Sequence, residues 1–287
     1  MALVNLQKIL EPAYQQRYAV GAFNVINLNF VEAIVDAARD RRSPVILNIA
    51  EVHFPFVTLE NIVPAIEAIA AREDVDIALN LDHGLTMEAI ERSIQNGFTS
   101  IMFDGSTLPF KENLTQTKGV VELCHSKGIS VEAELGAIGG AEGDETAGTA
   151  DRTKYTDVEQ ARRFVRETGV DALAVAIGNV HGKYKGEPDL DFDLLATLRE
   201  VTDIPLVLHG GSGLSEADFK RAISLGIAKV NFFTGMAQAA LEATEDFLEV
   251  RAGRYHDYPH LLRRVKQRVS AEVAEQMDVF GSTGKAD

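Results

Sequence analysis

The sequence is poor in cysteine and in long apolar runs. Cys124 is the only cysteine among 287 residues, so the chain can form neither an intramolecular disulfide nor a thiolate metal cluster. Apolar runs such as residues 43–50 are far shorter than the roughly 20 residues that span a bilayer, and no basic segment followed by an apolar run opens the chain. We therefore expect a soluble cytoplasmic protein with no membrane partner, in which histidine and carboxylate bind any transition metal.

Basic residues are also few, because 28 lysines and arginines stand against 43 acidic residues and give a formal charge of −15. Phosphate backbones require a clustered basic surface, so we expect no nucleic-acid partner. The chain has no low-complexity block and no Pro/Ser-rich linker, and about 250 residues is the usual size of one α/β barrel. Residues 1–287 are therefore predicted to form a single domain.

Short β-branched runs alternate with helical patterns along the chain. The expected strands are residues 18–24, 44–49, 76–81, 100–103, 130–134, 172–176, 205–209 and 228–231. Helical patterns include residues 29–41, 59–72, 86–95, 157–168 and 215–225. Eight such units predict a (β/α)8 TIM barrel, whose chemistry lies at the carboxyl ends of its strands. The alternative, an open doubly wound sheet, requires a Gly-rich fingerprint that residues 21–25 lack.

Ionisable residues stand at several predicted strand ends. The third strand runs into Asp82 and His83, which are either functional or a helix N-cap beside a histidine of the rim. On the fifth strand, Glu132 and Glu134 share one face by alternation. Because ionisable groups inside a barrel are costly unless paired, these two glutamates indicate either a metal site or a buried ion pair.

Three of the seven histidines follow three different strands at the same end of the barrel: His83, His181 and His209. Three imidazoles with open solvent access are typical ligands of a catalytic divalent metal, with zinc the first choice and iron, cobalt and manganese also compatible.

The last two strand ends are rich in glycine and small polar residues. Residues 209–213 read HGGSG and residues 231–235 read NFFTG, each just before a helix. Helix N-termini and exposed amides bind anions, and barrels commonly bind phosphate after strands seven and eight. The pair predicts a phosphate site, although the glycines could also serve only tight turns.

Together these motifs resemble the class II, metal-dependent ketose-bisphosphate aldolases, the fructose- and tagatose-bisphosphate aldolase type. The resemblance runs from GAFN at residues 21–24 to FGSTGK at 280–285. It includes LDHG at 81–84, VEAELG at 131–136, GNVHG at 178–182, LHGGSG at 208–213 and KVN at 229–231. It implies a carbon–carbon lyase that reversibly cleaves a ketose 1-phosphate or ketose 1,6-bisphosphate to dihydroxyacetone phosphate and an aldehyde, through a zinc-stabilised enediolate.

The resemblance also implies roles for individual residues. His83, His181 and His209 would bind Zn²⁺. Glu134 would either be an alternative ligand or contact the ligands without binding the metal itself. Asp82 would protonate the aldehyde oxygen in condensation, and Glu142 would move the proton of the donor ketone. Glu142 lies in residues 135–155, whose richness in Gly, Ala and Asp suits either a lid over the site or a solvated surface loop. Substrate and phosphate would be bound by Asn24, Gly182, Gly210, Ser212, Asn231 and Thr234. Backbone groups of Val180, Gly182, Gly210 and Ser212 would hold Na⁺ or K⁺.

The sequence departs from the family pattern near the acceptor. Ala50 stands where many relatives have serine, and His260 stands where a Pro-Arg pair often reaches a distal phosphate. An imidazole is a weaker phosphate ligand than a guanidinium. Either the acceptor aldehyde lacks a phosphate, or another arginine substitutes; the candidates are Arg251, Arg254, Arg263 and Arg264. Phe232 and Phe233 add apolar bulk beside this region.

Other functions remain open at this point. A Schiff-base aldolase needs a desolvated lysine, for which Lys229 is the strand-borne candidate. An amidohydrolase-type enzyme needs His-x-His on the first strand, where no histidine occurs. A non-catalytic paralogous subunit that stabilises an aldolase complex is the main alternative. We expect residues 236–287 to form a helical extension that packs across a homodimer or homotetramer interface, or else caps the same barrel.

Overall fold

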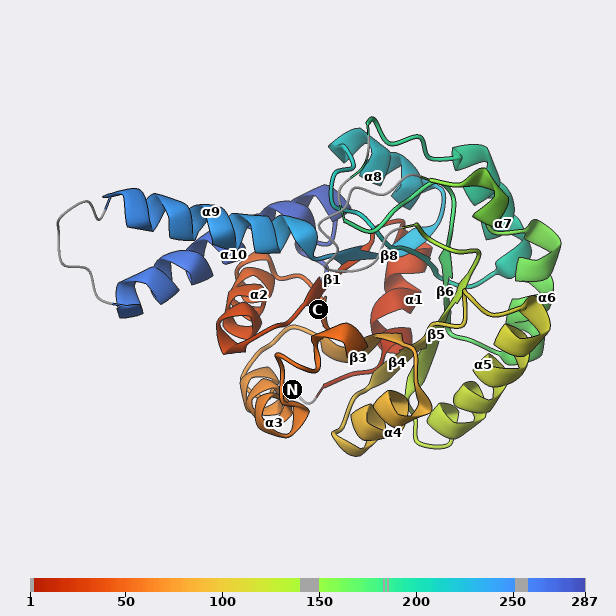
Figure 1. Cartoon of the computed structure of the whole chain (residues 1–287), viewed down its shortest axis with the longest axis horizontal. Coiled ribbons are helices and arrows are strands. Elements are labelled where there is room, and N and C mark those ends of the chain that lie inside the picture. Colours follow the sequence, from red (N-terminus) through yellow and green to blue (C-terminus); the bar gives the residue numbers. More distant parts are fainter. Residues whose placement is uncertain (1–2, 140–149, 183, 185, 251–257, 287) are drawn as a thin grey trace.

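A computed structural model describes residues 3–139, 150–182, 184, 186–250 and 258–286. Eight parallel strands close into a barrel in the order β1-β2-β3-β4-β5-β6-β7-β8, and helices surround it (Figure 1). The strands are β1 (Val20–Asn24), β2 (Val45–Ala50), β3 (Ile77–Gly84), β4 (Ser100–Phe103), β5 (Ser130–Leu135), β6 (Ala172–Val175), β7 (Leu206–Leu208) and β8 (Ile227–Phe232). The predicted (β/α)8 TIM barrel is confirmed.

The helices follow the strands as the sequence predicts, with short 3₁₀ turns at η1 (Glu51–His53) and η2 (Arg152–Lys154). The α-helices are α1 (Leu6–Gln16), α2 (Leu28–Arg41), α3 (Leu59–Ala70), α4 (Met87–Gln95), α5 (Phe110–His125), α6 (Val158–Thr168), α7 (Phe192–Thr202), α8 (Glu216–Ser224), α9 (Thr234–Val250) and α10 (Tyr258–Phe280). Local capping defines their starts: the side chain of Asp157, for example, accepts from the backbone N–H of Gln160 at the start of α6.

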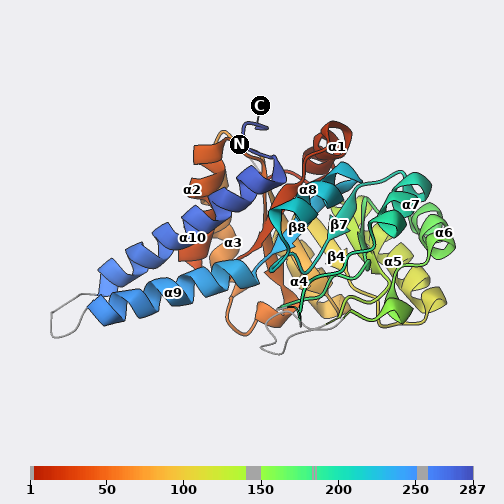
Figure 2. The same ribbon diagram turned by 90° about the horizontal axis from the view of Figure 1, so that it is seen from above.

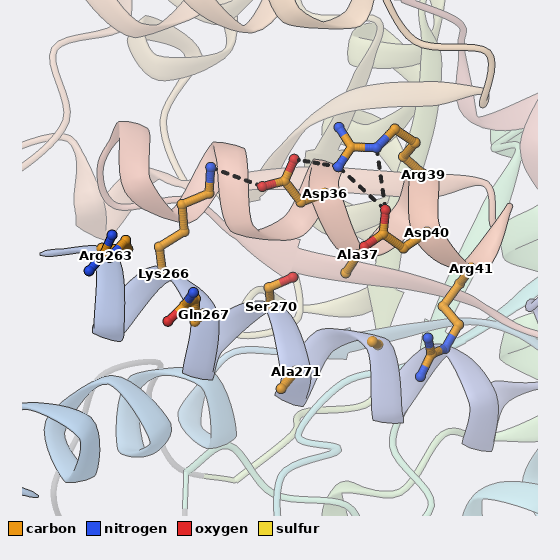
Figure 3. A pocket seen from close by; sticks show the side chains of 11 residues that line it. Asp36, Ala37, Arg39, Asp40, Arg41, Arg263, Lys266, Gln267, Ser270 and Ala271 are labelled. Carbon is orange, nitrogen blue, oxygen red and sulfur yellow. Dashed lines mark hydrogen bonds and ion pairs between the residues drawn. The ribbon is translucent and has the colours of Figure 1, made fainter. Parts of the chain in front are cut away.

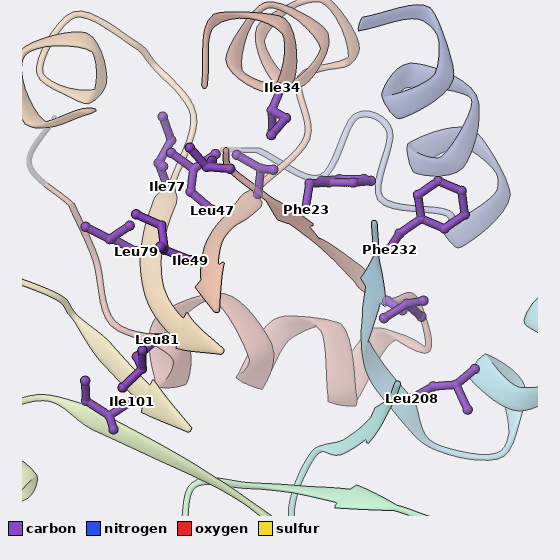
Figure 4. Close-up of a cluster of buried hydrophobic side chains, with 14 of the residues drawn as sticks. Phe23, Ile34, Leu47, Ile49, Ile77, Leu79, Leu81, Ile101, Leu208 and Phe232 are labelled. Atoms are coloured by element: carbon purple, nitrogen blue, oxygen red, sulfur yellow. The ribbon is translucent and has the colours of Figure 1, made fainter. Parts of the chain in front are cut away.

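Alternation along the strands divides the buried residues into two layers. Outward side chains such as Phe23, Leu47 and Leu79 pack against the surrounding helices (Figure 4). Inward side chains at the amino ends of the strands are apolar, and α1 closes that end with Leu6, Leu10 and other apolar residues. Because α1 fills the bottom, polar side chains inside the barrel are directed to its middle and its carboxyl-end mouth.

The C-terminal helices α9 and α10 lie side by side and reach beyond the barrel (Figures 1 and 2). α10 also packs along α2, where Lys266 Nζ lies 2.9 Å from Asp36 Oδ2 (Figure 3). The tail after α10 returns to the start of β2, since the N–H of Ala286 donates to the carbonyl of Arg42 at 2.8 Å. A surface pocket of about 560 Å³ between α2 and α10 is lined by charged residues and lies away from the strand ends.

Seven of the eight strands differ from the predicted ranges, each end by no more than three residues, and β4 alone matches at both ends. β1 begins at Val20 rather than 18, and β7 is only Leu206–Leu208, so His209 follows that strand directly. β3 continues to Gly84 because Ala50 pairs with Asp82 and Phe103 pairs with Gly84. This extension includes a register shift between Leu81 and Gly84, which determines how the third strand presents its polar residues.

Candidate active site

The structure brings His83, His181 and His209 together at the carboxyl-end mouth. The Nε2 of His83 lies 3.1 Å from the Nε2 of His181 and 2.9 Å from the Nδ1 of His209. All three residues are at most 8% exposed. His83 has φ 42°, a left-handed backbone conformation that is uncommon for a residue with a side chain. Its strained backbone belongs to the irregularity that interrupts the β3–β4 pairing between Leu81 and Gly84.

Two carboxylates fix which ring nitrogens carry the protons. The Nδ1 of His83 donates to Asp104 Oδ2 at 2.8 Å, and the Nε2 of His209 donates to Glu132 Oε1 at 2.8 Å. An ionised carboxylate can only accept a hydrogen bond. The single N–H of each neutral imidazole therefore lies on the nitrogen that faces its carboxylate. The inner nitrogens of His83 and His209 therefore present lone pairs to each other across 2.9 Å.

The protonation states agree with this arrangement. Burial, followed by repulsion from His83, lowers the pKa of His181 to about 3 and lowers the pKa of His209 well below its usual range. Burial acts to raise the pKa of Asp104, but the hydrogen bond and the charge of His83 lower it below the ordinary value. At neutral pH His181 and His209 are thus neutral, and Asp104 is an ionised carboxylate beside His83.

These nitrogens fit a divalent metal. Two facing lone pairs repel unless a cation lies between them, and tetrahedral Zn–N bonds of 2.0–2.1 Å place nitrogens about 3.3 Å apart. The two nitrogen–nitrogen separations, 2.9 and 3.1 Å, are close to that value. Carboxylates that accept from the outer nitrogens of ligating histidines are the usual support of such a site. The residues present therefore suit zinc or a similar ion.

Glu134 belongs to a second group of potential ligands, together with His83 and Asp104. Burial, and then the charge of Asp104, raises the pKa of Glu134 to about 8. Its Oε2 has no hydrogen-bond partner, which is unusual for a buried carboxyl oxygen. The structure thus places Glu134 next to His83, where it could bind a metal directly or contact the residues that bind it.

Asp82 is held by two amides inside the mouth. The Nδ2 of Asn24 donates to Oδ2 at 2.9 Å, and the Nδ2 of Asn231 donates to Oδ1 at 2.8 Å. Burial acts to raise the pKa of Asp82, but the charges of His83, His209 and Lys229 lower it below its ordinary value. The carboxylate form is thus favoured, in a fixed orientation.

Lys229 lies beneath this layer in a fully buried ion pair. Its Nζ lies 2.7 Å from Glu132 Oε2 and donates to Asn231 Oδ1 at 2.7 Å. The sequence indicated either a metal site or a buried ion pair for Glu132, and its contact with Lys229 is a buried ion pair. The same carboxylate also orients His209. The lysine nitrogen is thus committed to a carboxylate and an amide, which disfavours a Schiff base at this residue.

The loops after β6, β7 and β8 are tied together. Gly210 has φ +66°, and a Cβ there would lie 2.0 Å from the carbonyl oxygen of Val180, so only glycine fits. The hydroxyl of Tyr184 donates to the carbonyl of Gly210 at 3.0 Å and accepts from the N–H of Val180 at 3.3 Å. The hydroxyl of Ser212 accepts from the N–H of Gly235, the second residue of α9.

The remaining predicted residues are placed as follows. Gly182 follows His181 in the β6 loop, and Thr234 begins α9 beside the β7 loop. Ala50 is buried beside Asp82, whereas His260 is exposed near the start of α10. The predicted residues that lie outside the described part of the chain are Glu142, most of the predicted lid, Arg251 and Arg254.

Asp104, Tyr184 and His53 are site residues that sequence reasoning missed. Asp104 comes directly after β4, so the rule that chemistry lies at strand ends could have found it. His53 ends the turn η1, three residues beyond β2, and Tyr184 lies nine residues beyond β6, where no local pattern distinguishes them.

The comparisons with known proteins agree with this geometry. The model of the family described as fructose-bisphosphate aldolase class-II matches residues 4–285. The chain is 40% identical over 289 residues to a probable fructose-bisphosphate aldolase of Bacillus subtilis, covering 100% of each. It is also 40% identical to the fructose-bisphosphate aldolase of Geobacillus stearothermophilus, covering 100% of this chain and 99% of the relative. The chain belongs to the class II fructose-bisphosphate aldolase family.

A solved structure supports the assignment. The crystal structure of the YdjI aldolase from Escherichia coli K12 superposes with a TM-score of 0.89 at 38% identity, over 99% of this chain and 100% of that one. The chain is accordingly an aldehyde-lyase of the class II aldolase type. The family is generally metal-dependent, in keeping with the histidine cluster. No helix in the described part of the chain is long and apolar enough to cross a membrane.

Proposed function

We propose that this class II aldolase reversibly cleaves a ketose 1-phosphate or ketose 1,6-bisphosphate to dihydroxyacetone phosphate and an aldehyde, with Zn²⁺ as its native metal, in the cytoplasm. The observation that carries the proposal is the convergence of imidazole lone pairs beside an oriented carboxylate, Asp82. When bound there, a divalent ion would supply Lewis-acid stabilisation of the negative charge that develops on the donor carbonyl oxygen.

Asp82 is suited to move a proton at the acceptor oxygen. Its lowered pKa favours the carboxylate, which is the form that accepts the hydroxyl proton of the ketose in cleavage. In condensation the same group returns the proton to the aldehyde oxygen, as reversibility requires. The amides of Asn24 and Asn231 hold both carboxylate oxygens, so the acceptor oxygen meets a group of fixed direction.

Donor binding is assigned to the loops after β6, β7 and β8, together with Asn24 at the end of β1 and Asn231 within β8. Asn24, Gly182, Gly210, Ser212, Asn231 and Thr234 would bind the dihydroxyacetone phosphate portion. Backbone amides at the start of α9, next to the Ser212 hydroxyl, favour an anion. Backbone groups of Val180, Gly182, Gly210 and Ser212 would hold Na⁺ or K⁺, and Glu142 would act as the base at the donor carbon.

The test is turnover in both directions, with dihydroxyacetone phosphate and a panel of phosphorylated and unphosphorylated aldehydes, before and after EDTA. Activity that is lost on chelation and returns with zinc is the expected result. Activity that survives EDTA and is trapped by borohydride would point to a lysine Schiff base. Bound zinc with no turnover on any aldehyde would instead favour the alternative, a non-catalytic paralogous subunit that stabilises an aldolase complex.

The acceptor ranking from the same panel addresses the departures at Ala50 and His260. If phosphorylated aldehydes are strongly preferred, a basic side chain must replace the missing Pro-Arg pair. Arg263 and Arg264 lie near the start of α10, and Arg264 is 3.5 Å from Asp246. A preference for unphosphorylated aldehydes would instead indicate that the distal phosphate site is absent.

We also propose that α9 and α10 pack across a homodimer or homotetramer interface. Leu241, Leu248 and Val250 on α9 are 60%, 49% and 59% exposed, and the first two share a face at a spacing of seven. Sedimentation analysis of Leu248→Glu should show a smaller assembly than the wild type, whereas Glu249→Gln, on the neighbouring exposed position, should not. A monomeric wild type would refute the proposal.

A further inference from the structure

His83 has an unusual backbone for a candidate metal ligand. Its φ of 42° lies in the left-handed region, which is disfavoured for residues with a Cβ. Its Nε2 nevertheless lies 3.1 Å from the Nε2 of His181 and 2.9 Å from the Nδ1 of His209. A strained residue persists only where its surroundings hold it, so the contacts that flank His83 decide whether the three histidines stay together.

Strand β4 holds His83 from one side. The N–H of His83 donates to the sulfur of Met102 at 3.4 Å, and the N–H of Asp104 donates to the carbonyl of Gly84 at 3.0 Å. A Cβ on Gly84 would lie 2.7 Å from the carbonyl oxygen of Met102, so the two strands approach closely here. These contacts fix the position of His83 relative to β4, but they do not reach the chain beyond Gly84.

Strand β2, on the other side, pairs with β3 only as far as Asp82, which is opposite Ala50. The next residue after β2 is Glu51, which begins the turn η1. Its side chain continues the connection to β3 where the backbone pairing stops. The Oε2 of Glu51 accepts from the N–H of Leu85 at 2.6 Å and from the N–H of Thr86 at 3.1 Å. Its Oε1 accepts from the hydroxyl of Thr86 at 2.8 Å.

The chemistry of these three hydrogen bonds favours a firm connection. A carboxylate accepts at both oxygens, and its hydrogen bonds are roughly twice as strong as those between neutral groups. The N–H groups that it binds lie just before α4, whose positive end also favours a negative charge. Thr86 is the N-cap of this helix, since its Oγ1 accepts from the N–H of Ala89 at 3.1 Å. One side chain thus joins the end of β2 to the start of α4.

We propose that Glu51 is a positioning residue for His83. Its carboxylate holds the backbone at Leu85 and Thr86, so the segment that contains the strained His83 cannot relax, and the imidazole stays directed at the other two histidines. Without this carboxylate, β4 alone holds the segment, and the backbone can turn His83 away from the cluster. The inference rests on the proposed function, since it concerns the same metal centre. It adds a residue that acts through the backbone rather than by contact with metal or substrate.

The experiment measures Co²⁺ binding to the metal-free protein, without substrate. Cobalt is compatible with the histidine cluster, and its visible spectrum reports how the ion is coordinated. Competition with a chromogenic chelator gives the dissociation constant, and circular dichroism checks that each variant is folded. Glu51→Gln keeps the size of the side chain but replaces one accepting oxygen with an amide donor. Glu51→Asp keeps the charge on a side chain that is shorter by one methylene.

Glu60→Gln is the matched control. Glu60 lies on α3 and also binds α4, because its two oxygens accept from Arg92 Nε and Nη2, both at 2.9 Å. Arg92 is in the last turn of α4, at the opposite end of that helix from Thr86. The control therefore removes a carboxylate contact from the same helix without disturbing the segment that follows His83.

We expect Glu51→Gln to weaken cobalt binding about tenfold and to change the cobalt spectrum, because His83 no longer meets the ion in its native position. Glu51→Asp should weaken binding less, and Glu60→Gln should match the wild type in both measurements. If Glu51→Gln does not fold, Glu51→Asp decides alone. Weaker binding with a changed spectrum would then support the proposal, and wild-type values would overturn it.

Three results with folded Glu51→Gln would overturn the assignment. Wild-type affinity would mean that Glu51 does not act on the site. Weaker binding with an unchanged spectrum would mean that His83 keeps its position and that Glu51 only stabilises the loop. An equal loss in Glu60→Gln would mean a general loosening around α4.

Failure of the proposed function gives different results. A wild type that binds no cobalt would refute the metal centre itself, and this inference with it. A wild type that binds cobalt but turns over no aldehyde, even when loaded with zinc, would refute the proposed activity, while the cobalt measurements would still test the role of Glu51.

Discussion

Lys229 and Glu132 form an ion pair inside the barrel, with Nζ 2.7 Å from Oε2 and both side chains fully buried. Each partner also contacts the layer above it, since Glu132 accepts from His209 and Lys229 donates to Asn231. Asn231 in turn donates to Asp82. The orientation of a candidate metal ligand and that of the proposed acid–base group thus depend on one pair of charges.

Lys229→Met is expected to destabilise the protein by about 3–5 kcal/mol, because it leaves the Glu132 carboxylate buried without its counter-charge. Urea unfolding followed by circular dichroism gives the free energy of unfolding. Lys220→Met is the control: its pair with Glu216 is exposed, so its removal should cost no more than about 1 kcal/mol. A loss below 1 kcal/mol for Lys229→Met would contradict the role given to the pair.

Asp104→Asn is expected to weaken zinc binding about 10–100-fold, because the amide no longer fixes the His83 tautomer that presents a lone pair to the site. Competition with a chromogenic chelator measures the dissociation constant. Asp171→Asn removes the same kind of contact from His125, away from the mouth, and should leave zinc affinity unchanged. Equal zinc affinities for Asp104→Asn and the wild type would show that the Asp104–His83 hydrogen bond does not contribute to zinc binding.

Asp82→Asn keeps the size of the side chain but removes its ability to take a proton. We expect the turnover number for ketose cleavage to fall by about 10²–10⁴-fold, the usual contribution of a general acid or base. Proton exchange on dihydroxyacetone phosphate should persist, because that step does not involve the acceptor oxygen. Cleavage within threefold of the wild type would remove Asp82 from the mechanism.

Cys124 is expected to resist thiol reagents in the folded protein. Burial, with a smaller effect of Asp171, raises the pKa of its thiol to about 11, so at pH 8 only about one thiol in a thousand is ionised. The reactive thiolate becomes populated only as the pH rises toward 11. DTNB should therefore titrate one thiol in 6 M urea and none within minutes in native buffer. Rapid labelling of the native protein would show that the side chain is accessible.

Much of the architecture follows from local pattern. The apolar strands and their spacing predicted all eight strands, because strands covered on both sides need apolar side chains throughout. The helix predictions for residues 29–41 and 157–168 lie within one residue of α2 and α6, since capping residues such as Asn27 and Asp157 mark their starts. The placement of three histidines at one end of the barrel followed from topology alone.

Other features depend on contacts that no local pattern encodes. α1 closes the barrel bottom only because apolar residues from several strands meet beneath it, so its role was not predictable from residues 6–16. The extension of β3 through His83 depends on pairing with both β2 and β4. Likewise, the ionised state of Asp104 and the missing partner of His53 depend on side chains distant in sequence.

The three histidines also set an order of events during synthesis. His209 follows His83 by 126 residues, about 6–25 s of translation at roughly 5–20 residues per second. A nascent chain therefore carries its first candidate ligand long before its last, and β7 and β8 must leave the ribosome before the barrel can close. Metal binding by all three histidines would consequently be a late, post-closure event, and a chain truncated before His209 lacks part of the cluster however well its first strands pair.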